Sequence, residues 1–289
     1  MSGSIYGKQF CVSTWGESHG RGIGVVVDGC PAGLFLKESM VQDYLDRRKP
    51  GHTKYSTKRK ESDTVEILSG IFNNVTTGTP ISMMVYNQDQ RSKDYSDIVG
   101  YYRPGHADYT FSEKYGFRDY RGGGRSSGRE TIGRVAAGAV ASNILEKLGI
   151  NVMAYTKSIG GITIDYTRCK KDNVKISPLC MPDLEASKLA EDYLLNIMKE
   201  QDSAGGIIEC IITGMPAGIG EPVFDKLEAN LGKAVLSIGA VKAIEFGSGF
   251  LAAEKTGIEN NDPFQSNAEG KVTKLRNNAG GILGGISDG

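Results

Sequence analysis

The sequence predicts an α+β fold in which one strand–turn–helix–strand unit occurs twice. Two apolar, β-branched runs, 23–33 and 207–218, each end in Gly-x-Pro-Ala-Gly, with their prolines 185 residues apart. A long helix with regular apolar spacing separates the two runs. The chain also contains 39 glycines, about twice the ordinary share, which is typical of many tight turns. Two such units would form two similar layers packed together, within a single domain over residues 1–289.

Each turn is followed by a helix-like stretch and then by another strand-like run. In the first unit these are 37–48 and 65–72, and in the second they are 223–236 and 241–250. Both helical stretches place apolar residues on one face, as an amphipathic helix does.

The longest helix is predicted between the two units, over 129–148. Its apolar residues recur every three or four positions, and Gly149 follows as a stop signal. A second, amphipathic helix is predicted over 181–201, with a charged face that indicates a surface position. The polar stretch 254–277 is predicted to be a loop.

Composition excludes several classes of protein. The formal net charge is zero and the pI is near 6.8, so no global field attracts nucleic acid or a membrane surface. No apolar run approaches the ~18 residues of a membrane span, and the first residues lack the apolar centre of a signal peptide. The 5 cysteines form no Cys-x-x-Cys pair, so we expect no metal site and a cytoplasmic location.

Two of the three histidines lie in glycine-bounded polar segments. These are Gly16-Glu17-Ser18-His19-Gly20 and Arg103-Pro104-Gly105-His106-Ala107-Asp108. Histidine can give or take a proton near neutral pH. A lone histidine is more often a structural residue with a satisfied hydrogen bond, but two in such segments favour acid/base chemistry.

Two basic segments indicate the charge of the ligand. Residues 47–60 carry seven Lys and Arg side chains, which fits a solvated loop, a nucleic-acid patch or an anion-binding rim. The second segment, 118–134, contains five arginines and the glycine run Gly122-Gly123-Gly124, and it leads into the long helix. Ser126 or Ser127 could cap the N-terminus of that helix. Arginines and helix N-terminal amides both favour carboxylates and phosphates, so we predict a small polyanionic ligand.

In several of these segments the sequence resembles the chorismate synthase family. The two histidine segments resemble that family's histidine motifs, and Arg125-Ser126-Ser127-Gly128-Arg129-Glu130-Thr131 resembles a further signature. The resemblance continues in order along the chain through four more segments: 46–51, 76–81, 220–225 and 279–286.

The resemblance implies a fold, a reaction and a cofactor. The fold would be a β-α-β sandwich with internal duplication and helices between antiparallel sheets, assembled as a homotetramer. The reaction would be that of a phosphate lyase: anti-1,4-elimination of phosphate from 5-enolpyruvylshikimate 3-phosphate to give chorismate, the last step of the shikimate pathway toward the aromatic amino acids. The cofactor would be reduced FMN, with NADPH as a reductant in some members. No nucleic-acid or membrane partner is implied.

The resemblance also implies roles for individual residues. His19 corresponds to the acid that protonates the departing phosphate, and His106 to the histidine that protonates the reduced flavin. Substrate-binding positions are Ser18, Arg48, Lys54, Arg103 and Arg129. Cofactor-binding positions are Arg125, Ser126, Ser127, Gly239, Ala240 and Gly284.

Family members continue beyond the position of Gly289, with a Lys-Pro-Thr motif and an Arg-x-Asp-Pro motif that do not occur here. For a chain that stops at Gly289 the resemblance therefore predicts weak flavin binding and little turnover. The alternative function is an FMN- or anion-binding scaffold without catalysis.

Overall fold

The computed structural model describes residues 3–51, 53–56, 61–88, 100–120, 122–270 and 272–289. The chain divides into two compact units. The first comprises Met1–Arg125 and Ile132–Thr213, and the second comprises Ser126–Thr131 and Gly214–Gly289. The prediction of a single domain over 1–289 stays a prediction.

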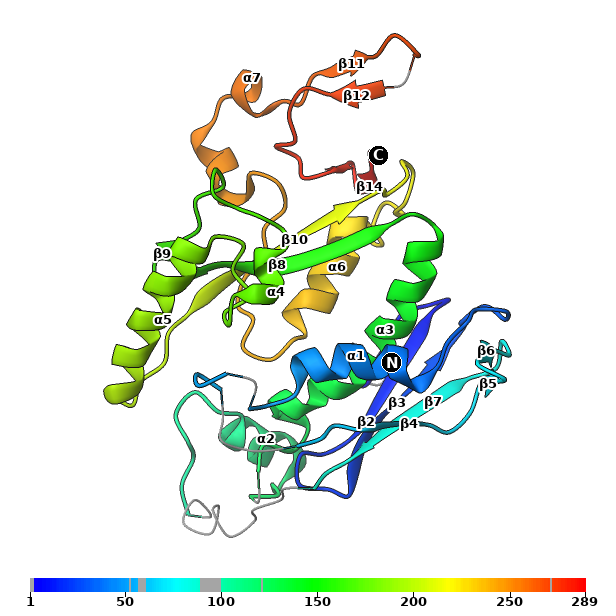
Figure 1. Ribbon diagram of the computed structural model, residues 1–289, viewed down its shortest axis with the longest axis vertical. Coiled ribbons are helices and arrows are strands. Elements are labelled where there is room, and N and C mark those ends of the chain that lie inside the picture. The colour runs from blue at the N-terminus through cyan, green and yellow to red at the C-terminus, as the bar shows by residue number, and fades with distance from the viewer. Residues whose placement is uncertain (1–2, 52, 57–60, 89–99, 121, 271) are drawn as a thin grey trace. The chain divides into compact units, whose positions relative to one another are not determined.

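The first unit contains a five-stranded antiparallel sheet in the order β1-β2-β3-β7-β4 (Figure 1). The side chains of Ile23, Val25 and Val27 in β3 point to the same face of the sheet, as the period of two in a strand requires, and are at most 1% exposed. The strands are β1 (Ile5–Tyr6), β2 (Cys11–Gly16), β3 (Gly22–Asp28), β4 (Val65–Ile67) and β7 (Ile81–Tyr86).

Helices α1 (Glu38–Arg48) and α3 (Thr131–Lys147) pack on the buried face of this sheet. Val41 and Leu45 of α1 are fully buried, and α3 contributes Ile132 and Val140 to the same core. Both helices were predicted from their apolar spacing and are confirmed. α3 approaches closely through Gly133, where a Cβ atom would lie 2.9 Å from the Thr14 side chain.

The first unit also contains a three-stranded antiparallel sheet in the order β10-β8-β9. Helix α5 (Leu184–Lys199) contacts β9, and its buried Ala186 and Ala190 join a small core with Tyr155 and Met181. This confirms the predicted amphipathic helix, whose inner face is buried. The sheet's strands are β8 (Asn151–Ile159), β9 (Ile162–Thr163) and β10 (Gly206–Thr213).

Shorter elements connect these layers. Two 3₁₀ turns, η2 (Gly124–Ser126) and η3 (Gly128–Glu130), lead into α3. The remaining short elements are β5 (Ile71–Phe72), β6 (Val75–Thr76), α2 (Asp108–Tyr115) and α4 (Asn173–Ile176).

The second unit corrects two predictions. The run 241–250 is not a strand, because Gly247 and Gly249 adopt left-handed φ values of 58° and 53° and lead into the 3₁₀ helix η4 (Gly249–Glu254). The stretch 254–277 is not only loop. The unit's other elements are α6 (Leu227–Leu236), α7 (Gly257–Asn260), β11 (Phe264–Ser266), β12 (Val272–Lys274), β13 (Ile282–Leu283) and β14 (Ile286–Ser287).

The predicted duplication is visible at atomic level in the two Gly-x-Pro-Ala-Gly turns. In the first, the Thr76 hydroxyl donates to the Pro31 carbonyl at 2.6 Å and accepts from the Leu34 amide at 2.9 Å. In the second, the Ser287 hydroxyl donates to the Pro216 carbonyl at 2.6 Å and accepts from the Ile219 amide at 2.9 Å. Both hydroxyl residues lie at the end of a short hairpin, β5–β6 or β13–β14.

The α+β fold with antiparallel sheets is thus confirmed. None of the helices in the described ranges is long and apolar enough to cross a lipid bilayer.

Candidate active site

The His19 segment is the turn that joins β2 to β3. Hydrogen bonds from a side chain to its backbone carbonyls fix its shape. The Asn87 side chain, just beyond β7, donates to the carbonyls of Glu17 at 2.9 Å and Gly20 at 2.8 Å. Ser18 is 1% exposed, and its hydroxyl lies 3.0 Å from Nδ1 of His19. A hydroxyl can donate or accept, so Ser18 can hold the ring in either protonation state.

Gly122 lies directly against the His19 ring. A Cβ atom at position 122 would be 2.0 Å from Nδ1 and 2.3 Å from Cε1 of His19. Only glycine allows this approach without displacing one of the two residues.

Arg125 holds the end of β2 that leads into the same turn. Its guanidinium donates to the Gly16 carbonyl at 3.2 Å, the Thr14 carbonyl at 3.2 Å and the Thr14 hydroxyl at 2.7 Å. These bonds give Arg125 a structural task, and its assignment as a cofactor ligand stays a prediction.

The His106 segment is organised around the buried carboxylate of Asp108, the first residue of α2. Arg103 binds it with two nitrogens, Nε and Nη2, each at 2.8 Å. Arg118 Nη1 lies 3.1 Å and His106 Nδ1 lies 3.0 Å from the Oδ1 atom. The Arg103 guanidinium holds the pKa of the Asp108 carboxyl well below its usual range, with a further contribution from its backbone amide.

One short segment connects both histidine loops. Arg118 contacts Asp108, Gly122 contacts His19, and Arg125 contacts Gly16. Gly122 is four positions after Arg118, so their Cα atoms are at most about 14 Å apart. Both histidine loops therefore contact residues of the same short stretch of the first unit.

Two other predicted substrate-binding cations also lie beside carboxylates. Arg48 Nη1 is 3.3 Å from Oδ2 of Asp63, a fully buried residue with a left-handed φ of 48°. Lys54 Nζ is 3.8 Å from Oε2 of Glu191 on α5. Hydrogen bonding to neighbouring Tyr55 contributes most to raising the pKa of Lys54, and Glu191 adds to it.

The backbone amides that precede α3 are hydrogen-bonded within the turn, unlike the free amides of a helix N-terminus that binds an anion. The Ser127 hydroxyl accepts from the Arg129 amide at 3.3 Å, and the Glu130 and Thr131 amides also bond within the turn. Ser127 is thus the capping serine, while Ser126 lies in η2. Three amide groups are used internally, so an anion here would be bound by side chains such as Arg129, which is 5% exposed.

The remaining predicted cofactor residues lie in turns of the second unit. Ala240 follows α6 with a left-handed φ of 68°, and Gly284 occupies the β13–β14 turn at φ 61°. A Cβ atom added at Gly239 or Gly284 would meet nothing within 4 Å. The two glycines therefore leave open space that a flat ligand could approach.

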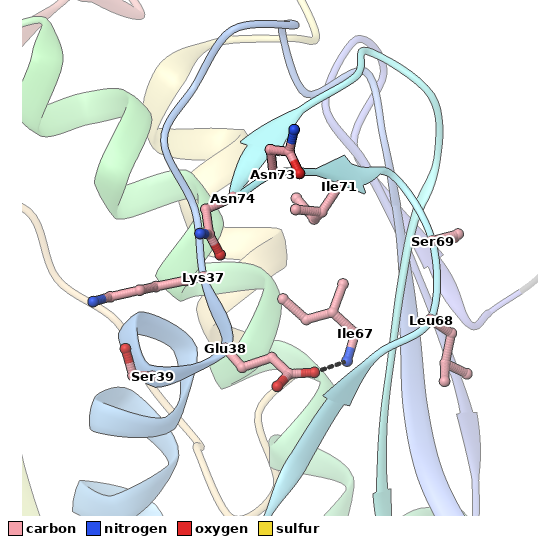
Figure 2. Close-up of a pocket in the computed structure, with 9 residues that line it drawn as sticks. All are labelled: Lys37, Glu38, Ser39, Ile67, Leu68, Ser69, Ile71, Asn73 and Asn74. Carbon is pink, nitrogen blue, oxygen red and sulfur yellow. Dashed lines mark hydrogen bonds between the residues drawn. The ribbon is translucent and has the colours of Figure 1, made fainter.

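A pocket of about 570 Å³ opens at the start of α1, away from both histidine segments in the sequence (Figure 2). Glu38 there accepts a hydrogen bond from the Ile67 amide at 3.0 Å. None of the predicted site residues lines this pocket. In the described ranges no group of three or more His, Cys, Asp and Glu side chains could hold a metal ion.

Sequence reasoning missed the residues that hold the site together. Asn87, Asp63 and Glu191 are each remote in sequence from the groups they contact. No local pattern marks them. Asp108 was visible as part of the second histidine segment but was not assigned a role.

Two histidine loops braced by arginines on a duplicated α+β scaffold have the features of an acid/base enzyme for anionic substrates. The family model for chorismate synthase matches residues 10–289. The chain therefore belongs to the chorismate synthase family.

Individual relatives agree with this assignment. The chain is 68% identical over 289 residues to the chorismate synthase of Lachnoclostridium phytofermentans, covering 100% of this chain and 79% of the relative. It is 52% identical over 291 residues to that of Methanosarcina acetivorans, covering 100% and 80%. A solved structure described as the crystal structure of chorismate synthase superposes with a TM-score of 0.82 at 29% identity, covering 98% of this chain and 82% of the other.

Proposed function

We propose that this chain acts as a phosphate lyase on 5-enolpyruvylshikimate 3-phosphate, forming chorismate with reduced FMN bound. The observation that carries the proposal is the segment 118–125, which contacts both histidine loops. Family membership supports the substrate and the cofactor.

In this proposal His19 gives a proton to the departing phosphate. The ring is fixed by Ser18 at Nδ1 and by the Gly122 backbone against its edge. A phosphate leaves more readily when it is protonated during departure, and a positioned acid contributes roughly 10²–10⁴-fold. His106 holds or donates the proton for the flavin.

The substrate carries a phosphate and two carboxylates, which the cations Arg48, Lys54, Arg103 and Arg129 would bind. Three of them already lie beside Asp63, Glu191 and Asp108. These carboxylates fix the direction of each cation before the substrate arrives, which reduces the ordering cost of binding.

The residues present are compatible with FMN. Gly239 and Gly284 leave open space, and Ser126 and Ser127 supply hydroxyls. Reduced FMN, when bound, would supply an electron-rich ring beside the substrate. We further propose a homotetramer in the cytoplasm, and NADPH as a reductant that would keep the flavin reduced.

The test is anaerobic turnover with chemically reduced FMN and 5-enolpyruvylshikimate 3-phosphate, followed by detection of chorismate. We expect product formation that falls at least ~10²-fold in His19→Ala and in His106→Ala, while exposed Lys188→Ala matches the parent chain. The full-length L. phytofermentans relative serves as the positive control. Retained binding of FMN and substrate without any product would contradict the proposal and support the scaffold alternative.

A further inference from the structure

The structure assigns a positioning role to Asp108: it holds Nδ1 of His106 so that proton exchange takes place at Nε2. The inference rests on the proposed function for the use of that proton. The geometry itself is independent of the substrate.

The Asp108 carboxylate is fixed from several sides. It is 5% exposed, and Arg103 binds it through Nε, Nη2 and the backbone amide, the last at 3.1 Å. Arg118 lies 3.1 Å from Oδ1 and is itself fastened by a 2.8 Å bond to the Tyr101 carbonyl. A carboxylate held by two guanidinium groups stays ionised and cannot rotate away.

All ring contacts of His106 within the described residues are made through Nδ1. Arg103 Nη2 forms a hydrogen bond with this nitrogen at 3.1 Å, and Asp108 Oδ1 lies 3.0 Å from it as the partner of an ion pair when the ring is protonated. The carboxylate can only accept a hydrogen bond, whereas the guanidinium can only donate one. The two neighbours therefore favour opposite tautomers of the neutral ring.

Asp108 decides this competition. Arg103 Nη2 already donates to Oδ1 at 2.8 Å, and an ionised acceptor next to Nδ1 favours a proton there. The protonated ring then donates Nδ1–H to Asp108. When it acts as an acid, the Nε2–H bond breaks, its electron pair stays on Nε2, and the proton moves to the acceptor. The neutral ring keeps Nδ1–H on Asp108, so no group has to rearrange.

The test is ¹⁵N NMR of histidine-labelled protein, with the His106 signals assigned by their loss in His106→Asn. We expect the neutral ring of the parent chain to carry its proton on Nδ1. In Asp108→Asn the amide can donate to Nδ1, and we expect the proton to move to Nε2. Asp192→Asn, which alters an exposed ion pair with Lys188, is the matched control and should leave the tautomer unchanged.

An Nε2–H tautomer in the parent chain would overturn the inference, and this measurement does not require Asp108→Asn to fold. An unchanged tautomer in a folded Asp108→Asn protein would overturn it as well. In turnover, Asp108→Asn should lower kcat ~10²-fold or more. The tautomer is measured without substrate, so failure of the proposed function leaves this result interpretable.

Discussion

At the scale of single residues, the two histidines are positioned by groups that carry no catalytic chemistry of their own. The Asn87 amide holds two carbonyls of the His19 turn, and the Gly122 backbone lies against the ring. Small displacements at such positions matter, because misplacing a reacting group by ~1 Å can reduce the rate about 10²-fold.

Gly122→Ala should therefore reduce turnover about 10²-fold without unfolding the protein. The new methyl group would lie 2.0 Å from His19 Nδ1, so the ring or the 118–125 segment must move. Chorismate formation measures the loss, and circular dichroism verifies the fold.

Gly138→Ala is the matched control. Gly138 lies within α3, where an added Cβ would meet nothing within 4 Å. Alanine is favoured over glycine in a helix by ~1 kcal/mol, so this variant should be at least as stable and fully active. Equal activity of the two variants would show that close packing on His19 is unimportant.

At the scale of elements, α5 depends on the buried N-cap Asp183. Its carboxylate accepts from the amides of Glu185 and Ala186 and pairs with Arg168 at 2.7 Å. Burial alone would raise the pKa of Asp183, but Arg168 and the backbone amides outweigh it and lower the pKa to about 2.

The pH dependence follows from the direction of this shift. A depressed pKa stabilises the folded state above the unfolded pKa of ~3.9, and this contribution disappears as the pH falls toward 2. Asp183→Asn should lose about 2 kcal/mol of unfolding free energy at pH 7 and about half as much at pH 3. Urea unfolding at both pH values measures the difference.

Asp172 provides the comparison for this prediction. It occupies the N-cap position of α4 but makes no capping hydrogen bond with its side chain. Asp172→Asn should change stability by less than ~0.5 kcal/mol at either pH. If the loss of unfolding free energy in Asp183→Asn does not depend on pH, the ionised N-cap is not its cause.

Periodicity explains which elements could be predicted from sequence. α3 and α5 each repeat their apolar residues with the period of a helix, β3 is a continuous β-branched run, and each was predicted. The run 241–250 is also apolar, yet Gly247 is held against the Asn278 carbonyl in a conformation that breaks a strand. That contact is long-range, so no local pattern reveals it.

At the scale of the whole molecule, each unit has one buried hydroxyl that holds its Gly-x-Pro-Ala-Gly turn, which we call the hydroxyl anchor of that turn. Thr76 and Ser287 are 3% and 4% exposed, and each hydroxyl makes two backbone hydrogen bonds. Thr76→Val and Ser287→Ala should each cost ~2–4 kcal/mol, because buried donors and acceptors lose their partners. Hydrogen exchange should accelerate at Leu34 in the first variant and at Ile219 in the second.

Thr77→Val is the control for the first anchor, because the Thr77 hydroxyl bonds only to exposed Thr79 among the side chains described. It should leave both exchange rates unchanged. If Thr76→Val and Ser287→Ala accelerated neither amide, the two turns would not depend on their hydroxyls.

The candidate site was predictable where its residues are neighbours in sequence. His106, Arg103 and Asp108 form one segment, and so do Ser18 and His19. Partners such as Asp63 and Glu191 come from other elements, and only the folded chain brings them to Arg48 and Lys54.

The chain has a single tryptophan, and its location makes it a built-in optical reporter. Trp15 pairs across the sheet with Gly24 and its ring lies over that glycine, with the side chain 39% exposed. It is the next-to-last residue of β2, just before the turn that carries Ser18 and His19. Its emission should respond when a ligand settles near that turn. Titrations could therefore be followed with the unlabelled protein, and the tryptophan emission, excited apart from the tyrosines, would report from one known position in the chain.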